Sequence, residues 1–422
     1  MTDSIILHAY EIARERYAEL GVDTAAALQQ LQSISISLQC WQGDDVGGFE
    51  RPETSLSGSG LQVTGNYPGK ARTVAELRMD VEKAFALIPG RHRFNLHAMY
   101  GEFGGKEVDR DAITVEHFHG WSDWARANQL KLDFNATCFS HPKADSGFTL
   151  SHRDAAIREF WIEHVQRCRE ISVALGRAQN SPCIHNLWIP DGSKDLPADR
   201  WSPRERLRAS LDKIFEVKHG PNDMKDALES KLFGLGSEAY VVGSHEFYLG
   251  YALTHGKMIC FDMGHYHPTE SVADKISAIL QFCPELLLHV SRGVRWDSDH
   301  VVILNDELRS LAEEIVRSNE LERIHLALDF FDASIHRVAA WVLGARATLK
   351  ALLLALLEPR AQLLQYEAES DYSSRLAWLE ESKSLPFGAV WDYHCLQMNV
   401  PVGMAWLQEL KSYEERVTSK RV

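Results

Sequence analysis

Short apolar or β-branched runs recur between residues 34 and 328, and segments with a helical period separate them. Such runs are typical of buried strands, and their alternation with helices favours a parallel sheet. The commonest closed form of such a sheet is the eight-stranded barrel. We therefore predict an α/β fold, a (β/α)8 TIM barrel, with a doubly wound open sheet as the alternative. The predicted strands are Ile34–Cys40, Arg93–Met99, Lys131–Ala136, Cys183–Ile189, Ala227–Phe233, Lys257–Phe261, Leu286–Val290 and Ile324–Leu328.

Beyond Phe331 the strand-like runs stop, while helical periods continue between several prolines. We therefore divide the chain into 1–345, the barrel with its N-terminal helices, and 346–422, an additional C-terminal helical region. This extension either packs on the barrel or mediates oligomerisation. Its most apolar stretch, Ala339–Leu357, contains Arg346 and Lys350 and is expected to be too short to span a bilayer.

A long glycine-rich segment, residues 43–69, joins the first predicted strand to the first barrel helix. A βα loop of this length is uncommon unless it is functional, which favours a lid or a binding loop. A disordered surface loop is the alternative. The glycine spacing does not fit a phosphate-binding loop.

The charge balance restricts the partners of the chain. It has 45 Lys+Arg against 59 Asp+Glu, a formal net charge of −14. Nucleic acid binding requires clustered basic residues and is disfavoured, whereas acidic sites attract cations. The seven cysteines form no C-x-x-C pair, and the N-terminus lacks the basic region of a signal peptide. We expect free thiols, a cytoplasmic location and no membrane partner.

Four predicted late strands end in a polar residue that follows an apolar run, namely Glu229, Asp262, His289 and Asp329. Burying an unpaired carboxylate is costly, so each of these residues requires a cation, a hydrogen-bond network or a metal. The carboxyl ends of barrel strands meet at one mouth, where the four side chains would converge. Three carboxylates and one imidazole suit Mg²⁺ or Mn²⁺ and are acceptable to Zn²⁺.

A second group of possible ligands lies just beyond two of these strands. His265 follows Asp262 in the segment DMGHYH, and Asp297 and Asp299 lie in WDSDH. Residues at i and i+2 of an extended segment point the same way, so the two aspartates are able to hold one cation, with His265 as a further ligand. Such short motifs also arise by chance on solvated loops. Together with the four strand-end residues, they predict a two-metal site.

Other candidates have simpler explanations that stay open. Lys231 lies two residues after Glu229, which suits either catalysis or an ion pair. His97 ends the second predicted strand and is either functional or a hydrogen-bonded core histidine. Trp41 and Trp188 end two further strands, where they either stack on a sugar ring or pack in the core.

The segments LQCWQGDDVGGFE, TGNYPGKAR, ESKLFGLG, DMGHYHPTE, HVSRGVRWDSDHVV and LDFFDASIHR resemble those of L-rhamnose isomerases, and the resemblance covers nearly the whole chain. It implies a metal-dependent barrel of the xylose-isomerase-like kind, commonly a homotetramer, that interconverts L-rhamnose and L-rhamnulose in L-rhamnose catabolism. One departure is His245, where the family leads us to expect Asn.

The resemblance also implies roles for individual residues. A structural metal, Zn²⁺ or Mn²⁺, would be held by Glu229, Asp262, His289 and Asp329. A catalytic Mn²⁺ would be held by His265, Asp297 and Asp299. An apolar pocket for the methyl group of the sugar would be formed by Val46, Leu56 and Phe331.

The chemistry expected of an aldose–ketose isomerase assigns further roles and needs no organic cofactor. His97 would shuttle a proton during ring opening, on the assumption of an ordinary imidazole pKa near 6.5. A metal-assisted C1–C2 hydride shift would follow, with Asp329 handling hydroxyl protons and Lys231 supporting the oxyanion on O1. An enediol route is the competing mechanism. A metal-dependent hydrolase or lyase and a non-catalytic sugar-binding barrel are the alternative functions.

Overall fold

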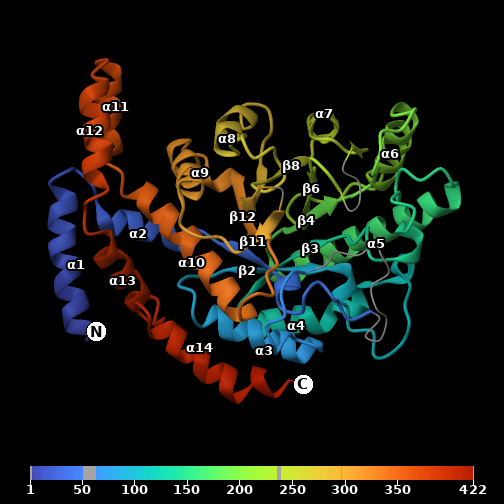
Figure 1. The fold of residues 1–422 in the computed structure, drawn as a ribbon, viewed down its shortest axis with the longest axis horizontal. Helices are drawn as coiled ribbons and strands as arrows, with labels where there is room; N and C mark the ends of the chain where they lie inside the picture. Colours follow the sequence, from blue (N-terminus) through green and yellow to red (C-terminus); the bar gives the residue numbers. More distant parts are fainter. Residues whose placement is uncertain (1, 51–62, 235–238, 296, 422) are drawn as a thin grey trace.

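The computed structural model describes residues 2–50, 63–234, 239–295 and 297–421, and for Asp297 and Ser298 the backbone alone. Parallel strands form a closed barrel in the order β1-β12-β9-β8-β6-β4-β3-β2. Figure 1 draws strands as arrows near the centre of the molecule, with helices around them. The closed barrel is therefore confirmed, and the open sheet is wrong. The barrel strands are β1 Ile36–Gln39, β2 Arg93–His97, β3 Lys131–Asn135, β4 Cys183–Trp188, β6 Met224–Glu229, β8 Met258–Asp262, β9 Leu286–Val290 and β12 Ile324–Leu328.

The fifth barrel strand is the one whose predicted position is most displaced. The prediction was Ala227–Phe233, whereas β6 spans Met224–Glu229. The charged residue Asp226 is accepted inside the strand because Arg169 and Lys257 bind its carboxylate, at 3.0 and 2.6 Å. Because β6 ends at Glu229, Lys231 lies beyond the strand, although the predicted strand included it.

Helices cover the outside of the barrel, and local signals explain where several of them begin. The Thr73 hydroxyl accepts from the Glu76 backbone N–H at the start of α3, and the Asn305 side chain accepts from the Leu308 N–H at the start of α9. The helices up to the end of the barrel are α1 Asp3–Ala18, α2 Thr24–Ser33, α3 Val74–Phe85, α4 His119–Ala127, α5 Ala155–Gln179, α6 Trp201–Ile214, α7 His245–His255, α8 Ala273–Ile279, α9 Asp306–Arg317 and α10 Arg337–Leu356.

Two short antiparallel pairs lie in the loops that follow barrel strands. β5 (Gly192–Ser193) pairs with β7 (Tyr240–Val241), and β10 (Arg292–Val294) pairs with β11 (Asp297–His300). The second pair confirms that the segment with Asp297 and Asp299 is extended.

The C-terminal region is helical, as predicted, and consists of α11 Arg360–Ala368, α12 Tyr372–Ser382, α13 Phe387–Gln397 and α14 Ala405–Arg416. Of these helices, α13 lies between Pro386 and Pro401 and was not predicted. It packs against α1, where Tyr10 and Tyr393 stack with ring centroids 3.7 Å apart. In Figure 1 the hairpin of α11 and α12 projects away from the barrel.

The helix α10 crosses the predicted domain boundary at residue 345. With 20 residues it is long and apolar enough to cross a membrane, so the prediction that this stretch is too short is wrong. However, 78% of its most apolar window is buried inside the protein. Arg346 is accommodated because its guanidinium donates to the Leu87 carbonyl, at 2.9 Å. This burial is that of a core helix.

Candidate active site

The four predicted strand-end residues converge at the carboxyl ends of neighbouring strands. Glu229 and Asp262 are the last residues of β6 and β8, His289 lies near the end of β9, and Asp329 directly follows β12. One ligand atom from each lies within 4.8 Å of the ligand atoms of the other three. The convergence follows from the parallel barrel, in which Asp262 and His289 are direct register partners.

In each carboxylate of this cluster, one oxygen accepts a hydrogen bond from a residue outside the cluster. The Asn186 amide donates to Glu229 Oε2 at 2.5 Å, and the Ser291 hydroxyl donates to Asp262 Oδ1 at 2.6 Å. The Trp41 indole N–H donates to Asp329 Oδ1 at 3.2 Å. Such outer hydrogen bonds orient metal ligands in proteins.

The remaining atoms face the centre of the cluster. Glu229 Oε1, Asp262 Oδ2 and His289 Nδ1 are buried and form no hydrogen bond with any of the described residues. His289 Nδ1 lies 3.3 Å from Glu229 Oε1 and 3.0 Å from Asp329 Oδ2. Buried polar atoms without partners are rare and require an explanation. A divalent cation among these donors would satisfy them, so the residues present fit a metal.

The pKa values of the cluster also indicate that its carboxylates require a positive charge nearby. Burial raises the pKa of Asp262 to about 6. Burial also opposes ionisation of Glu229, but His289 and His265 outweigh it and hold the pKa of that carboxyl well below its usual range. Burial disfavours a charged His289, yet Cys260 and Glu229 raise the pKa of the imidazole well above its ordinary value. The His289 proton therefore provides charge that a metal ion would replace.

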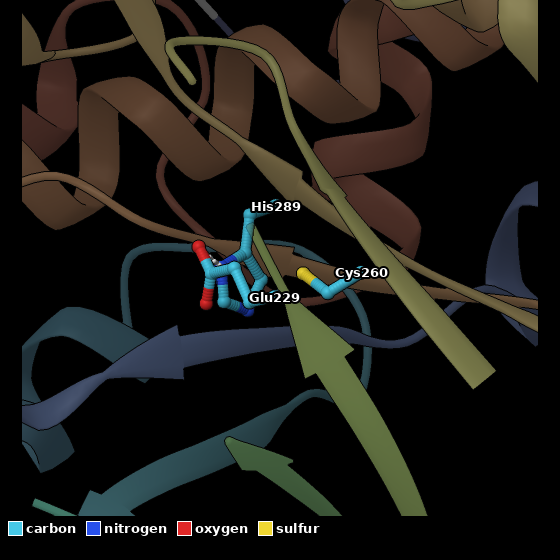
Figure 2. A group of neighbouring side chains, drawn as sticks. All are labelled: Glu229, Cys260 and His289. Carbon is cyan, nitrogen blue, oxygen red and sulfur yellow. Dashed lines mark ion pairs between the residues drawn. The ribbon is translucent and has the colours of Figure 1, made fainter. Parts of the chain in front are cut away.

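Sequence reasoning missed one member of this site. Cys260 lies two residues before Asp262 on β8, so both side chains point to the barrel interior. Its sulfur belongs to a group with Glu229 and His289 whose ligand atoms lie within 4.8 Å of one another, and Figure 2 shows the thiol directed at the imidazole ring. Burial raises the pKa of the thiol. The alternation of MICFD would have identified this neighbour.

A cavity adjoins the cluster and brings the other predicted site residues together. Among the predicted residues, its lining includes Trp41, Val46, His97, Trp188, Glu229, Lys231, His265, His289, Asp299, Asp329 and Phe331. Phe139 also lines it, although the sequence analysis did not single it out. Leu56 lies outside the described residues, as does the side chain of Asp297.

His265 lies at the border between the cluster and the cavity. Its Nδ1 is 3.1 Å from Glu229 Oε1 and also 3.1 Å from the Ser230 carbonyl oxygen. The Lys231 ammonium lies 5.8 Å from the centroid of the Trp188 ring, close enough for a cation–π contact.

His97 is held by a hydrogen bond and by ring packing, and its pKa is far from the ordinary value. Its Nδ1 lies 2.9 Å from the Thr137 hydroxyl oxygen, and its ring packs edge-on against Trp41, with centroids 4.8 Å apart. Burial and the positive charge of Arg110 lower the pKa of His97 to about 3. The assumption of an ordinary imidazole pKa is therefore wrong, because burial penalises the charged ring.

A second, larger cavity lies at the opposite end of the barrel. Its lining includes Arg93 and Asp133, which neutralise each other through a bidentate ion pair of 2.7 and 2.8 Å. Barrel enzymes have their reactive groups at the carboxyl ends of the strands, so this cavity is not the candidate site.

Comparison with known proteins identifies the family of the chain. A model of the L-rhamnose isomerase (RhaA) family matches residues 4–421. The chain belongs to the L-rhamnose isomerase family. It is 59% identical over 413 residues to the L-rhamnose isomerase of Rhodopirellula baltica, covering 98% of this chain and 96% of that protein. It is 55% identical over 413 residues to the enzyme of Escherichia coli O127:H6, covering 98% of both chains. Among solved structures, an L-ribulose 3-epimerase matches at 12% identity and a TM-score of 0.46, covering 72% of this chain and 97% of that one.

His245, the position where the family leads us to expect Asn, lies behind the site. His245 Nδ1 is 2.9 Å from the Ser230 hydroxyl oxygen, and the Tyr266 hydroxyl lies 3.1 Å from the same nitrogen. Ser230 and Tyr266 are the chain neighbours of Glu229 and His265. His245 therefore contacts the supports of the cluster and leaves its ligand atoms untouched.

Proposed function

We propose that this protein is a metal-dependent aldose–ketose isomerase that interconverts L-rhamnose and L-rhamnulose. The proposal rests on three buried atoms, Glu229 Oε1, Asp262 Oδ2 and His289 Nδ1, that form no hydrogen bond with the described residues. They lie beside a cavity lined with aromatic rings. Close relatives over nearly the whole chain carry the name L-rhamnose isomerase. The seven free, buried cysteines are consistent with a reducing cytoplasm.

Two ligand sets would hold the metals. Glu229, Asp262, His289 and Asp329 would bind the structural ion, either Zn²⁺ or Mn²⁺, and the Cys260 sulfur beside them favours a softer ion such as Zn²⁺. His265, Asp297 and Asp299 would bind the catalytic Mn²⁺. When bound, a divalent cation supplies Lewis acidity at the C1 carbonyl and C2 hydroxyl oxygens of the open-chain sugar.

His97 would assist ring opening as a neutral imidazole. A pKa of about 3 means that the ring does not store a proton at neutral pH. It is still able to accept a proton on one nitrogen while it releases one from the other, because Nδ1 faces the Thr137 hydroxyl and the ring lines the cavity. A proton would thus pass between the ring oxygen of the sugar and water.

Two further side chains would handle the charges that develop during isomerisation. Asp329, held by the Trp41 indole, would take and return the hydroxyl proton of the sugar. Lys231, beside Trp188, would stabilise negative charge on O1. A hydride would move from C2 to C1. With L-rhamnose deuterated at C2, deuterium retained in the product supports this route, and exchange with solvent supports the enediol route.

The apolar part of the cavity would select the sugar. Val46 and Phe331 line it and are 2% and 8% exposed. These two residues, together with Leu56, would bury the methyl group that distinguishes L-rhamnose from L-mannose. A hydroxyl in the same place would lose its hydration without gaining a partner.

The projecting hairpin would mediate assembly into a homotetramer. Leu364, Tyr372 and Leu376 on α11 and α12 are each more than half exposed, and α12 has no buried residue. A hairpin that exposes such side chains and projects from the barrel suits contact with another subunit. Light scattering coupled to gel filtration tests this: a tetramer for the parent and a smaller species for Leu376→Glu are expected, and a monomeric parent would contradict the assembly.

The test of function is the conversion of L-rhamnose by purified protein, with and without a chelator. We expect L-rhamnulose to form, the chelator to stop the reaction, and Mn²⁺ to restore it best. A metal-dependent hydrolase or lyase would consume other substrates and leave L-rhamnose intact, and a sugar-binding barrel would bind L-rhamnose without converting it.

A further inference from the structure

The backbone next to the cavity contains two consecutive non-glycine residues in the left-handed region. Asp45 has φ 61° and Val46 has φ 58°. This conformation is uncommon for any non-glycine residue and exceptional for a β-branched one such as Val46. Strained residues persist only where the surrounding structure holds them, and they concentrate at functional sites.

A buried ion pair holds this strained turn. Arg337, the first residue of α10, donates to both carboxylate oxygens of Asp45, from Nε at 3.0 Å and from its terminal nitrogen at 2.8 Å. The side chains of Arg337 and Asp45 are 4% and 18% exposed. The second terminal nitrogen of Arg337 donates to the backbone carbonyls of Tyr67 and Pro68. One guanidinium therefore joins the beginning of the segment 43–69 to its end.

Neighbouring hydrogen bonds fix the rest of the turn. The Val46 backbone N–H donates to the Trp41 carbonyl at 3.1 Å. The buried Asp44 carboxylate accepts from the Gly48 N–H at 2.7 Å and from the Tyr100 hydroxyl at 2.6 Å. Asp45 is thus held by the guanidinium of a distant helix, with the Lys70 ammonium 3.9 Å from the same carboxylate, whereas Asp44 and Val46 are held by Tyr100, Gly48 and Trp41.

The strain has a consequence for the cavity. Val46 is 2% exposed and lines the cavity together with Trp41, His97 and Phe331. The direction of its isopropyl group depends on the left-handed φ, because rotation to a negative φ would move the Cβ atom relative to the rest of the loop. The position of this apolar surface is therefore set by the groups that hold the turn.

We infer that the Asp45–Arg337 pair determines the specificity of the enzyme between 6-deoxy sugars and their 6-hydroxy analogues. The pair keeps Val46 in its strained conformation and thereby keeps the apolar wall against the sugar methyl group. Asp45 and Arg337 are positioning residues, since neither lines the cavity. The inference rests on the proposed function, because it takes the apolar wall to be the methyl pocket.

The main test variant is Asp45→Asn, because Asn has nearly the same shape and tolerates the left-handed region well. The measurement is kcat/KM for L-rhamnose and for L-mannose with the full-length, Mn²⁺-loaded enzyme. An apolar pocket discriminates such a pair by roughly 10–200-fold. The ratio of interest is kcat/KM for L-rhamnose divided by kcat/KM for L-mannose. We expect Asp45→Asn to reduce this ratio by about threefold or more, mainly through a higher KM for L-rhamnose.

Asp45→Asn leaves the Arg337 charge buried without its partner and could prevent folding. The double variant Asp45→Asn/Arg337→Gln removes both charges and is expected to lower the ratio in the same way. Arg337→Lys, which keeps the charge and loses the two-pronged geometry, serves if neither of these folds. The matched control is Glu358→Gln, which removes the carboxylate that Arg317 binds at 2.6 and 2.9 Å away from the cavity. This control should leave the ratio unchanged.

Val46→Ala distinguishes a failure of the proposed methyl pocket from a failure of the inference about the Asp45–Arg337 pair. If Val46→Ala leaves the ratio unchanged, the methyl pocket of the proposed function is wrong. If Val46→Ala lowers the ratio while the ion-pair variants match the parent, the pocket stands and the inference is overturned. An ion-pair variant that loses thermal stability with the parental ratio also overturns it, because the pair would then be structural only.

Discussion

Removing the divalent metal should destabilise the folded protein without unfolding it. The metal would satisfy Glu229 Oε1, Asp262 Oδ2 and His289 Nδ1, which are buried and lack hydrogen bonds within the described part of the chain. Without the metal, the raised pKa of His289 favours the imidazolium, which balances part of the carboxylate charge. The stripped protein therefore retains a compensated cluster and should stay folded.

The size of the effect follows from mass action. A ligand present at a hundredfold excess over its dissociation constant stabilises the folded state by about 2.7 kcal/mol. For a chain of 422 residues, the entropy of unfolding is roughly 0.9 kcal/mol per kelvin. Removing the metal should therefore lower the melting temperature by about 3 °C, and by more if binding is tighter.

The assay is a calorimetric melt of metal-loaded and chelator-stripped protein, with metal content measured in each sample. Asp262→Asn should lose most of the metal-dependent shift, because its Oδ2 faces the cluster. Asp191 is the matched control, since it is equally buried but each of its oxygens already accepts two hydrogen bonds from Thr149 and Ser151. Asp191→Asn should keep the shift. Equal melting temperatures for loaded and stripped parent protein would refute the reasoning.

Three further predictions concern single side chains. Asp297→Ala should lose nearly all turnover at saturating Mn²⁺ while the protein stays folded, as judged by circular dichroism; near-normal turnover would exclude Asp297 as a ligand. Lys231→Met should lower kcat by about 100-fold and change KM much less, measured by saturation kinetics; a change in KM alone would make Lys231 a binding residue. Burial raises the pKa of Asp44 to about 7, above its unfolded value near 3.8. The stability that the protonated group contributes is present below about pH 4 and lost as pH rises through 7. When pH rises from 5.5 to 8, the free energy of unfolding of the parent should therefore fall by about 2 kcal/mol more than that of Asp44→Asn. Urea titration at both pH values measures this, and parallel pH profiles would contradict it.

Much of the fold and of the metal cluster follows from local pattern. Short apolar runs alternating with helical periods predict a parallel barrel, because few other arrangements bury every apolar face. Once the barrel is assumed, a polar residue at the end of each apolar run must lie at one mouth. Glu229, Asp262, His289 and Asp329 are therefore predictable as neighbours, although they lie up to a hundred residues apart in the chain.

The rest depends on groups brought together from distant segments. The strand position of Asp226 depends on Arg169 and Lys257, and the low pKa of His97 depends on burial that no local pattern reports. The conformation of Val46 is opposed by its own side chain, so residue preferences argue against it. Arg337, almost three hundred residues further along, binds Asp45 in this turn. The sequence by itself determined the barrel and the convergence of the four strand-end residues, because periodicity and strand direction are local properties. Tertiary structure alone decided the charge states and the shape of the cavity, because both depend on desolvation and on partners far away in the chain.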